Sequence, residues 1–529
     1  MISGDETLAA LRRYWGHSSF RPLQERIVAS LLAGHDTCVV MPTGGGKSLC
    51  YQLPAALLPE KTVVVVSPLI ALMQDQVNQL TQMGIAAGML NSTLSRDEQY
   101  EVIRRARRGE YRLLYLSPER LARIDTVPLL KAVPVAFFVI DEAHCISEWG
   151  HEFRPDYRLL SSLRQHFPDR PIAAFTASAT RRVRHDIIDQ LRLREPHKYI
   201  ASFHRANLRY FVRECEAQAQ PALLVRALTR HAGSNVIVYS PTIRRVSETV
   251  EFLEEQGIPA LGYHARMDNE QRKRNQERWM ADEVKVLVGT IAFGLGINKA
   301  AVRSVIHLAL PKSIEQYYQE AGRAGRDGRP SDCILLWARR DLGLLTYFIN
   351  QIVDPAEKQR AWQRYHDICG FAESSRCRHR QICLHFGENP KWNTCGACDV
   401  CTTMPQWLAG TSVRPVGRQK KTAQLASSNG KSTDRRQPEP VKPAVNARHS
   451  EALFEHLRSW RRSISTARGI PAFTVMHDST LDELSRVQPE SLDGLRKVHG
   501  IGERKIEQYG RDLLDAIKKF RSAVKPEHL

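Results

Sequence analysis

The sequence predicts an α/β protein with two parallel-sheet lobes, a small helical region rich in cysteine and a C-terminal all-α domain. Three observations support this prediction. Apolar runs recur up to about residue 336, cysteines cluster near residue 400, and leucines fall at helical spacing beyond residue 450. The chain of 529 residues is too long for one core, because a domain averages ~150 residues.

Short apolar runs rich in β-branched residues indicate strands that are buried on both faces of parallel sheets. The first series includes Thr37–Met41, Thr62–Ser67, Leu113–Leu116, Ala136–Ile140 and Ile172–Phe175, and the second includes Asn235–Tyr239, Val284–Val288 and Ser304–Leu308. Charged stretches with helical periodicity, such as Arg96–Arg108 and Ile243–Gln256, indicate crossover helices. A polar stretch around Ala201–Pro221 separates the two series, which predicts lobes at 1–205 and 206–340.

Beyond the lobes the sequence pattern changes three times. Residues 341–403 are first helical and then cysteine-rich in pattern. Residues 404–448 are rich in Pro, Gly, Ser, Gln and basic residues, which predicts a disordered cationic linker. Residues 449–525 carry apolar residues at helical spacing, which predicts a small helical domain.

The charge balance indicates a polyanionic partner. The formal net charge is +19, whereas the 42% hydrophobic and 25% charged residues are ordinary for a globular protein. An excess of this size favours nucleic acid over a merely solvated basic face. A membrane is not expected, since no apolar run approaches ~20 residues and the N-terminus lacks a signal-peptide pattern. Six of the 11 cysteines are scattered and the rest are clustered, which favours a reducing cytosol and one metal site.

The segment Met41–Ser48 has the context of a phosphate-binding loop, because it follows a predicted strand and precedes a predicted helix. Its alternative is a plain glycine-rich turn, since Met41 replaces the usual first glycine. As a phosphate-binding loop, it would use Lys47 to neutralise the ATP phosphates and the Ser48 hydroxyl to ligate Mg²⁺. The predicted ATP contacts in this loop are Thr43, Gly44, Gly45, Gly46, Lys47 and Ser48.

Two adjacent carboxylates, Asp141 and Glu142, follow the predicted strand Ala136–Ile140. On its own, an Asp-Glu pair is more often a solvated turn. Combined with a phosphate-binding loop, it predicts that Asp141 holds Mg²⁺ through water and that Glu142 activates the attacking water.

The second lobe contributes two arginines within the segment Gln319–Arg326. Arg323 and Arg326 lie three residues apart among glycines, which is compatible with a simple basic loop. An ATPase, however, needs positive charge on the γ-phosphate in the transition state, and an arginine finger contributes ~10³–10⁵ in rate. An arginine finger from a second lobe requires the two lobes to close on each other.

Together these residues resemble superfamily-two helicases, and more specifically the RecQ family of DNA helicases, whose motor consists of two RecA-like lobes. The segment Phe20–Gln24 resembles the family's adenine-reading motif, which implies that Arg21 contacts ATP and that Gln24 reads the adenine edge. The resemblance also implies that His17 stacks on the base, although the family usually has an aromatic ring there.

The most diagnostic resemblance is Ile146–Pro155, which resembles the aromatic-rich loop that links single-strand binding to ATP hydrolysis in RecQ proteins. Trp and Phe rings stack on unpaired bases for ~1–3 kcal/mol each. Core packing is the alternative for these rings, but the polar and glycine neighbours disfavour it. Other segments resemble motifs Ia, Ib, III and V. The DNA contacts implied are Ser67, Trp149, His151, Phe153, Arg154, Thr290 and Asn298, and Gln319 joins the catalytic residues.

Four cysteines, Cys377, Cys395, Cys398 and Cys401, have a spacing that suits one tetrahedral ion. An iron–sulfur cluster uses the same number of ligands. We expect Zn²⁺, because Cys377–Cys401 resembles the RecQ zinc subdomain. Cys383 is expected to be a core thiol, since the family usually has an apolar residue there.

The tail at 449–525 resembles an HRDC domain, a module that contacts nucleic acid or protein. Its segment Val498–Lys505 predicts a hairpin whose amides meet a phosphate, or else a plain interhelical turn. RecQ proteins commonly place a winged-helix domain before such a tail. Here only about 45 low-complexity residues occupy that interval, so we expect the winged helix to be absent.

The expected function is therefore a 3′→5′ DNA helicase that uses ATP and Mg²⁺, contains Zn²⁺ and acts in recombination and repair. Direction and pathway follow from the resemblance alone. The alternatives are a translocase or remodeller that unwinds weakly without the winged helix, a non-catalytic scaffold, and an RNA helicase. Expected partners are single-stranded and duplex DNA, a single-strand-binding protein and other repair factors, for a monomer in the cytoplasm or on the nucleoid.

Overall fold

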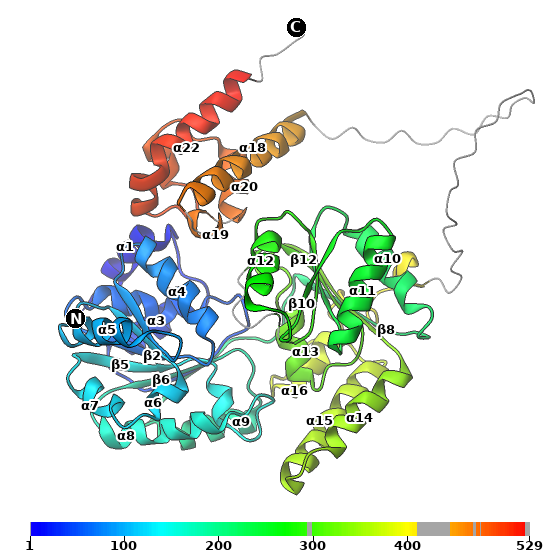
Figure 1. Ribbon diagram of the computed structural model, residues 1–529, viewed down its shortest axis with the longest axis horizontal. Coiled ribbons are helices and arrows are strands. Elements are labelled where there is room, and N and C mark those ends of the chain that lie inside the picture. The colour runs from blue at the N-terminus through cyan, green and yellow to red at the C-terminus, as the bar shows by residue number, and fades with distance from the viewer. Residues whose placement is uncertain are drawn as a thin grey trace, which may run out of the picture.

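The computed structural model describes residues 2–291, 293, 299–409, 445–468, 472–476 and 478–523. Asn298 and residues 410–444 of the predicted linker lie outside these ranges. The predicted absence of a winged helix concerns the same interval and also lies outside them. Two α/β lobes stand side by side, with a helical domain above both and a helical pair extending below the second lobe (Figure 1).

The first lobe contains a seven-stranded parallel sheet in the order β3-β4-β2-β5-β6-β1-β7. Its strands are β1 Thr37–Val40, β2 Thr62–Val66, β3 Ala87–Leu90, β4 Leu113–Leu116, β5 Val135–Ile140, β6 Ile172–Thr176 and β7 His197–Ile200. Its helices are α1 Gly4–Trp15, α2 Gln24–Leu32, α3 Lys47–Leu57, α4 Ile70–Gln82, α5 Arg96–Arg107, α6 Pro118–Leu121, α7 Thr126–Lys131, α8 Leu163–His166 and α9 Arg181–Gln190, with 3₁₀ segments at Ala143–Ile146 and Pro155–Ser162.

Both faces of this sheet are buried, as the apolar runs predict. In β2, Val64 and Val66 belong to one apolar cluster, whereas Val63 and Val65 belong to another on the opposite face. Alternate side chains of a strand point to opposite faces, so a strand covered on both sides needs a continuous apolar run.

The second lobe contains a six-stranded parallel sheet in the order β10-β11-β9-β12-β13-β8. Its strands are β8 Leu208–Glu214, β9 Asn235–Tyr239, β10 Ala260–Tyr263, β11 Val286–Gly289, β12 Val302–His307 and β13 Ser331–Trp337. Its helices are α10 Gln220–Arg230, α11 Ile243–Glu255, α12 Asn269–Met280 and α13 Ile314–Ala321.

All eight predicted strands are present within a residue or two of their expected bounds, which confirms the predicted fold class. The prediction that residues 201–221 form only a polar separator between the lobes is incomplete. It contains β8, which pairs along its whole length with β13. The edge strand β7 was not predicted either, because its side chains are largely exposed and it has no apolar run.

The region after β13 is helical and then compact around the cysteines. A short 3₁₀ turn at Arg339–Asp341 leads into α14 Leu342–Asn350, α15 Pro355–Glu373 and α16 Arg378–His385, and a turn of helix, α17, follows at Gln406–Ala409. Leu408 of α17 is buried in the core of the second lobe, and Trp407 meets Phe211 edge-on at 6.2 Å. The prediction that the linker begins at residue 404 is therefore wrong for its first residues, which pack on the lobe.

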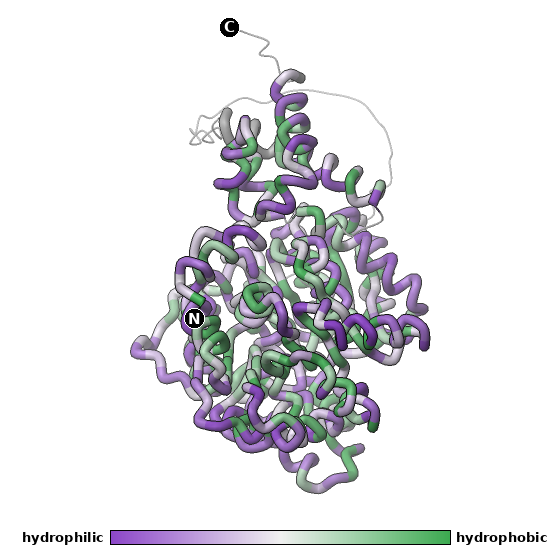
Figure 2. Tube along the Cα trace, turned by 90° about the vertical axis from the view of Figure 1, so that its left-hand side faces the viewer, coloured by the Kyte–Doolittle hydropathy of each residue, from purple (hydrophilic) through white to green (hydrophobic). Residues whose placement is uncertain are grey.

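The tail is a helical bundle, as predicted. Its helices are α18 Val445–Arg468, α19 Ala472–Val475, α20 Asp478–Val487, α21 Leu492–Arg496 and α22 Glu503–Ala523. Leu453, Leu457, Leu481 and Leu484 are fully buried in its core. Figure 2 shows hydrophilic and hydrophobic stretches alternating along these helices, the pattern expected for amphipathic helices in a small bundle. Among the described residues, none of the helices combines the length and apolarity needed to span a membrane.

Candidate ATP site, nucleic-acid interface and zinc cluster

The loop between β1 and α3 has the geometry of a phosphate cradle. Gly44 and Gly46 have φ angles of +79° and +81°, a region that favours glycine. A Cβ added at Gly45 would lie 2.9 Å from the Pro42 carbonyl oxygen, so the loop has no room for a side chain there. Lys47 begins α3, and its ammonium donates to the Met41 carbonyl at 3.4 Å. The amides of a helix N-terminus and one lysine therefore converge where an anion would bind.

The predicted adenine-reading segment lies against this loop. The Gln24 side-chain amide donates to the carbonyl oxygens of Gly45 and Gly46 at 3.4 and 3.2 Å. Its own oxygen accepts from the Arg21 backbone N–H at 2.8 Å, and the Arg21 guanidinium donates to the Gly44 carbonyl. The structure thus places both residues beside the phosphate loop.

The two predicted catalytic carboxylates lie at the end of β5, close to Lys47. Burial and the neighbouring Glu142 charge raise the pKa of Asp141. Burial opposes ionisation of Glu142 as well, but the Lys47 ammonium and His144 outweigh it and lower the pKa of that carboxyl. Glu142 has a φ of +45°, which is unusual for a residue with a side chain. Such strain is concentrated at functional sites.

His144 connects this carboxylate pair to the predicted aromatic-rich loop. Its ring is fully buried and stacks on His151 at a centroid distance of 4.7 Å. Its Nδ1 lies 2.9 Å from the Thr176 hydroxyl and 3.3 Å from the Glu142 carboxylate. We did not assign His144 a role from the sequence, although it follows Glu142 closely.

The second-lobe arginine segment lies directly against the phosphate loop. A Cβ added at Gly44 would be 3.1 Å from Cγ of Arg326, and the Thr43 hydroxyl donates to the Gly322 carbonyl at 3.1 Å. Burial lowers the pKa of Arg326 to about 9. The structure therefore brings the predicted finger segment and the phosphate loop together across the lobe boundary.

Two further contacts at this boundary involve Gln319, which the sequence predicts to be catalytic, and Arg205, which it does not single out. Gln319 donates to the Ser178 hydroxyl at 2.7 Å, and its side chain lies near the His151 ring. Arg205 donates to the Thr43 carbonyl at 3.0 Å and to the Gly325 carbonyl at 2.9 Å, so it joins the phosphate loop to the arginine segment. No local motif marks Arg205, because its partners are remote in sequence.

The aromatic-rich loop is partly exposed and surrounded by arginines. Trp149 is 38% exposed. The Arg182 guanidinium lies 3.0 Å from its ring centroid, and that of Arg360, from α15, lies at 5.2 Å. Phe153 has the guanidinium of Arg158 at 5.6 Å from its ring. Exposed aromatic rings among cations suit stacked bases and phosphates.

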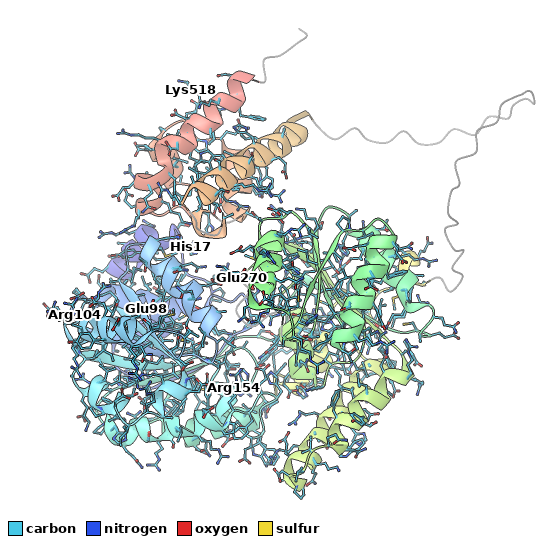
Figure 3. The ribbon with its side chains drawn as sticks, viewed as in Figure 1. His17, Glu98, Arg104, Arg154, Glu270 and Lys518 are labelled. Atoms are coloured by element: carbon cyan, nitrogen blue, oxygen red, sulfur yellow. The ribbon has the colours of Figure 1, made fainter. Side chains whose placement is uncertain are left out.

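The other predicted DNA contacts come from both lobes. Arg154 donates to the Pro68 carbonyl at 3.3 Å, next to the buried Ser67, and Figure 3 shows Arg154 on the side that faces the second lobe. Thr290 follows β11, and its N–H donates to the Tyr263 carbonyl at 3.2 Å. Asn298 lies outside the described residues.

The four predicted metal ligands come together. The sulfur atoms of Cys377, Cys395, Cys398 and Cys401 all lie within 4.8 Å of one another. This separation fits four thiolates around one Zn²⁺ with Zn–S bonds of ~2.3 Å. Cys383 is fully buried and is not among these four, so the prediction of a core thiol is confirmed.

The hairpin Val498–Lys505 packs on the first lobe. The Gly500 N–H donates to the Gly16 carbonyl at 3.2 Å, and a Cβ added at Gly502 would lie 2.6 Å from the Arg13 carbonyl oxygen. This part of the hairpin therefore does not present free amides to a phosphate, and the alternative of a structural turn describes it better.

Family models match four successive parts of the chain. They are those of the DEAD/DEAH box helicase at residues 21–187, the helicase conserved C-terminal domain at 219–328, the RecQ zinc-binding region at 339–402 and the HRDC domain at 450–517. The zinc-binding match agrees with the four-cysteine cluster.

Curated relatives and solved structures agree with these family matches. An ATP-dependent DNA helicase RecQ of Haemophilus influenzae is 33% identical over 99% of this chain and 97% of its own length, and one of Bacillus subtilis is 34% identical over 96% and 98%. Two solved structures share the fold. Mss116p bound to single-stranded RNA and AMP-PNP has a TM-score of 0.53 at 16% identity, over 73% of this chain and 90% of its own. The Mycobacterium smegmatis helicase Lhr has a TM-score of 0.50 at 18% identity, over 67% and 56%.

The order of the four matched regions agrees with the two sheets, the cysteine cluster and the helical tail. The identity to the bacterial relatives extends over nearly their whole length. The chain therefore belongs to the RecQ family of ATP-dependent DNA helicases.

Proposed function

We propose that this helicase moves 3′→5′ along single-stranded DNA, and that it separates the duplex ahead of it in recombination and repair. The observation that best supports a motor is the contact between the arginine segment of the second lobe and the phosphate loop of the first. A site divided between two lobes is complete only when they are closed, so each hydrolysis cycle changes their separation.

The ATP site uses residues from both lobes in this proposal. The loop residues Thr43 to Lys47 hold the phosphates, with Ser48 and Asp141 on Mg²⁺ and Glu142 on the attacking water. Arg323 and Arg326 neutralise charge that develops on the γ-phosphate. His17, Arg21 and Gln24 hold the adenine. The buried carboxylate of Asp141 beside Lys47 suits a divalent cation, because the cation offsets the cost of ionising the carboxylate there.

The route from hydrolysis to DNA runs through buried polar contacts. Gln319, in the arginine segment, donates to the Ser178 hydroxyl and lies near the His151 ring. His151 stacks on His144, and His144 lies beside Glu142. His151 also belongs to the same loop as Trp149 and Phe153. A shift of the second lobe therefore reaches the loop that we propose to hold single-stranded DNA.

Strand displacement on two substrates tests the direction. We expect ATP-dependent unwinding of a duplex with a 3′ single-stranded tail and little unwinding of one with a 5′ tail. Unwinding of only the 5′-tailed duplex would contradict the proposed direction. The relatives are DNA helicases by name, which favours unwinding over the translocase alternative.

Stimulation of ATP hydrolysis tests the choice of nucleic acid. We expect single-stranded DNA to stimulate hydrolysis strongly and Lys47→Ala to abolish it while leaving the fold intact. Equal stimulation by RNA of the same sequence would argue against DNA as the track. A monomer in the cytoplasm or on the nucleoid, assisted by a single-strand-binding protein, completes the proposal.

A further inference from the structure

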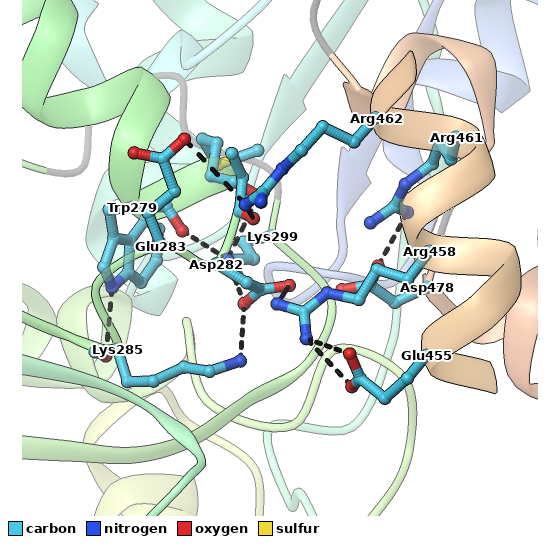
Figure 4. A network of polar contacts seen from close by, with 12 residues as sticks. Trp279, Asp282, Glu283, Lys285, Lys299, Glu455, Arg458, Arg461, Arg462 and Asp478 are labelled. Carbon is cyan, nitrogen blue, oxygen red and sulfur yellow. Dashed lines mark hydrogen bonds and ion pairs between the residues drawn. The ribbon is translucent and has the colours of Figure 1, made fainter. Parts of the chain in front are cut away.

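The tail domain is fixed against both lobes, and its contacts with the second lobe are mainly ionic. Arg458 of α18 pairs with Asp282 at 2.8 Å, and Arg462 donates to the Ala281 carbonyl at 3.1 Å. Figure 4 shows this network, in which Asp282 also forms an ion pair with the buried Lys299 ammonium at 2.9 Å. A further ion pair joins Arg329 to Asp482.

The contact with the first lobe is different, because it is close packing of backbone. The hairpin Gly500–Gly502 lies against the C-terminal end of α1. A Cβ added at Gly16 would lie 2.5 Å from the Ile501 nitrogen, so the two segments approach as closely as glycine allows. The Gly500 N–H donates to the Gly16 carbonyl, which fixes their register.

This docking places a tail side chain on a residue of the proposed adenine site. The rings of His17 and His499 stack with centroids 4.2 Å apart and an interplanar angle of 15°. Figure 3 shows His17 where the first lobe meets the tail. His17 is partly exposed, so the ring is not enclosed by this contact.

The side from which the hairpin arrives indicates which face of His17 it covers. The hairpin contacts residues that precede His17, namely Arg13, Tyr14 and Gly16. The other proposed adenine contacts, Arg21 and Gln24, follow His17 and reach the phosphate loop. A base held beside Arg21 and Gln24 would approach His17 from the side of the phosphate loop, whereas the tail approaches it from the side of α1.

We propose that His499 is a positioning residue for ATP binding. The His499 ring stacks on one face of the His17 ring and leaves the opposite face available to adenine. The proposal rests on the proposed function, in which His17 stacks on the base. The tail domain is then part of the nucleotide site as well as a module beside it. A single imidazole is a small stacking surface, and a second ring behind it fixes its orientation.

The affinity for nucleotide tests this proposal. We expect His499→Ala to raise the KM for ATP, and the Kd for a fluorescent ADP analogue, by about 3- to 10-fold, the range that one aromatic pair contributes. The kcat at saturating ATP and single-stranded DNA should stay unchanged. His499→Phe should restore the wild-type KM, because it keeps the ring. Lys497→Ala, an exposed change nearby, is the matched control and should behave as wild type.

A double-mutant cycle separates this proposal from the adenine assignment. We expect His17→Ala to raise the KM, and His17→Ala with His499→Ala to raise it no further, because His499 acts only through His17. If His17→Ala raises the KM and His499→Ala does not, the positioning role is wrong and the adenine assignment stands. If His17→Ala has no effect, the adenine assignment is itself wrong. A lower KM in His499→Ala would show that His499 blocks the base, which would overturn the proposal.

Discussion

The Trp149 ring is partly exposed and is contacted by two guanidinium groups. Arg182 comes from α9 of the first lobe and Arg360 from α15, far along the chain. A base can stack on the indole in place of one of the two guanidinium groups. The displaced guanidinium can then pair with a phosphate of the same strand.

Replacement of Trp149 tests this reading of the aromatic-rich loop. We expect Trp149→Ala to raise the single-stranded DNA concentration for half-maximal ATPase stimulation by about 5- to 150-fold, since one stacked base contributes ~1–3 kcal/mol. Hydrolysis without DNA should change little. Tyr100→Ala removes an exposed aromatic ring from α5, outside the proposed site, and should leave the stimulation curve unchanged. An unchanged curve in Trp149→Ala would exclude the stacking role.

His385 and Glu315 form a buried pair between α16 and α13, with 2.8 Å between Nε2 and the carboxylate oxygen. Burial favours the neutral imidazole, but the Glu315 charge outweighs it and raises the pKa of His385. The pair lowers the pKa of Glu315 in turn. Its contribution to stability is therefore complete between the ordinary carboxyl and histidine pKa values, ~4.3 and ~6.5, and is lost as pH rises through the raised pKa of His385.

The thermal stability of His385→Gln relative to wild type should show this pH dependence. At pH 6 we expect the variant to be less stable by about 1–3 kcal/mol, the range for a hydrogen bond to a charged group. The difference should shrink as the pH is raised towards 9. His166→Gln, at an exposed position, should show no such trend. A difference that is constant across this range would mean that His385 does not titrate within it, which would contradict the predicted pH dependence.

At the scale of elements, the edge strand β8 joins the cysteine cluster to the second lobe. Tyr210 of β8 donates its N–H to the Ala397 carbonyl at 3.2 Å and accepts from the Asp399 N–H at 2.9 Å. Asp399 is itself paired with the buried Arg378 at 3.0 Å. The segment from Ala397 to Asp399 thus extends the sheet by one short bridge. The cysteine cluster therefore supports the second lobe.

Loss of a zinc ligand should consequently destabilise the second lobe as well as the zinc subdomain. We expect Cys401→Ser to release Zn²⁺ and to lower the unfolding temperature of the second lobe, because structural zinc sites contribute directly to folding. Zinc release measured with a chromogenic chelator and amide exchange of Tyr210 would check both parts. Cys369→Ser changes a thiol outside the cluster and should retain Zn²⁺. Zinc loss without faster exchange at Tyr210 would show that the two are independent.

At the scale of the whole molecule, Arg205 joins parts of the two lobes that, in the proposed function, meet for hydrolysis. It donates to carbonyl groups of both the phosphate loop and the arginine segment. A guanidinium suits this place, because its planar fork donates in several directions at once.

Removal of this connection should affect the chemical step. We expect Arg205→Ala to reduce the DNA-stimulated kcat by about 10- to 100-fold, the scale that misplacement of catalytic groups produces. The KM for ATP should change less, since the first lobe still binds the nucleotide. Arg209→Ala, in the neighbouring strand β8, removes a partly exposed pair with Asp332 and serves as the control. An equal loss in the control would indicate a general defect of the lobe.

The tail belongs to the same scale, because its ionic contacts reach the second lobe while its hairpin reaches the first. We expect Arg458→Glu to weaken docking and to increase the radius of gyration in small-angle scattering, since the new carboxylate faces Asp282. High salt should increase the radius of wild type in the same direction. Lys518→Glu reverses an exposed charge on α22, at the end of the tail away from the lobes (Figure 3), and should keep the compact form.

The sequence by itself determined the parts of this protein whose chemistry lies in short, continuous segments. The phosphate loop, the carboxylates after β5 and the three close cysteines need particular residues at fixed spacing, because the local backbone alone places them. The strands with continuous apolar runs were predictable for the same reason, since burial on both faces leaves a local signature.

The tertiary structure alone decided which of these segments meet. Arg205 bridges the lobes, Arg360 covers Trp149, and His499 stacks on His17. Neither Arg205 nor Arg360 lies in a local motif, and the hairpin that contains His499 does not indicate its partner. Such contacts join residues that are far apart in the chain, so their specificity depends on the packing of whole domains. The strand β8 was missed for a related reason, because an edge strand is defined by its neighbour β13 and by the cysteine turn beside it.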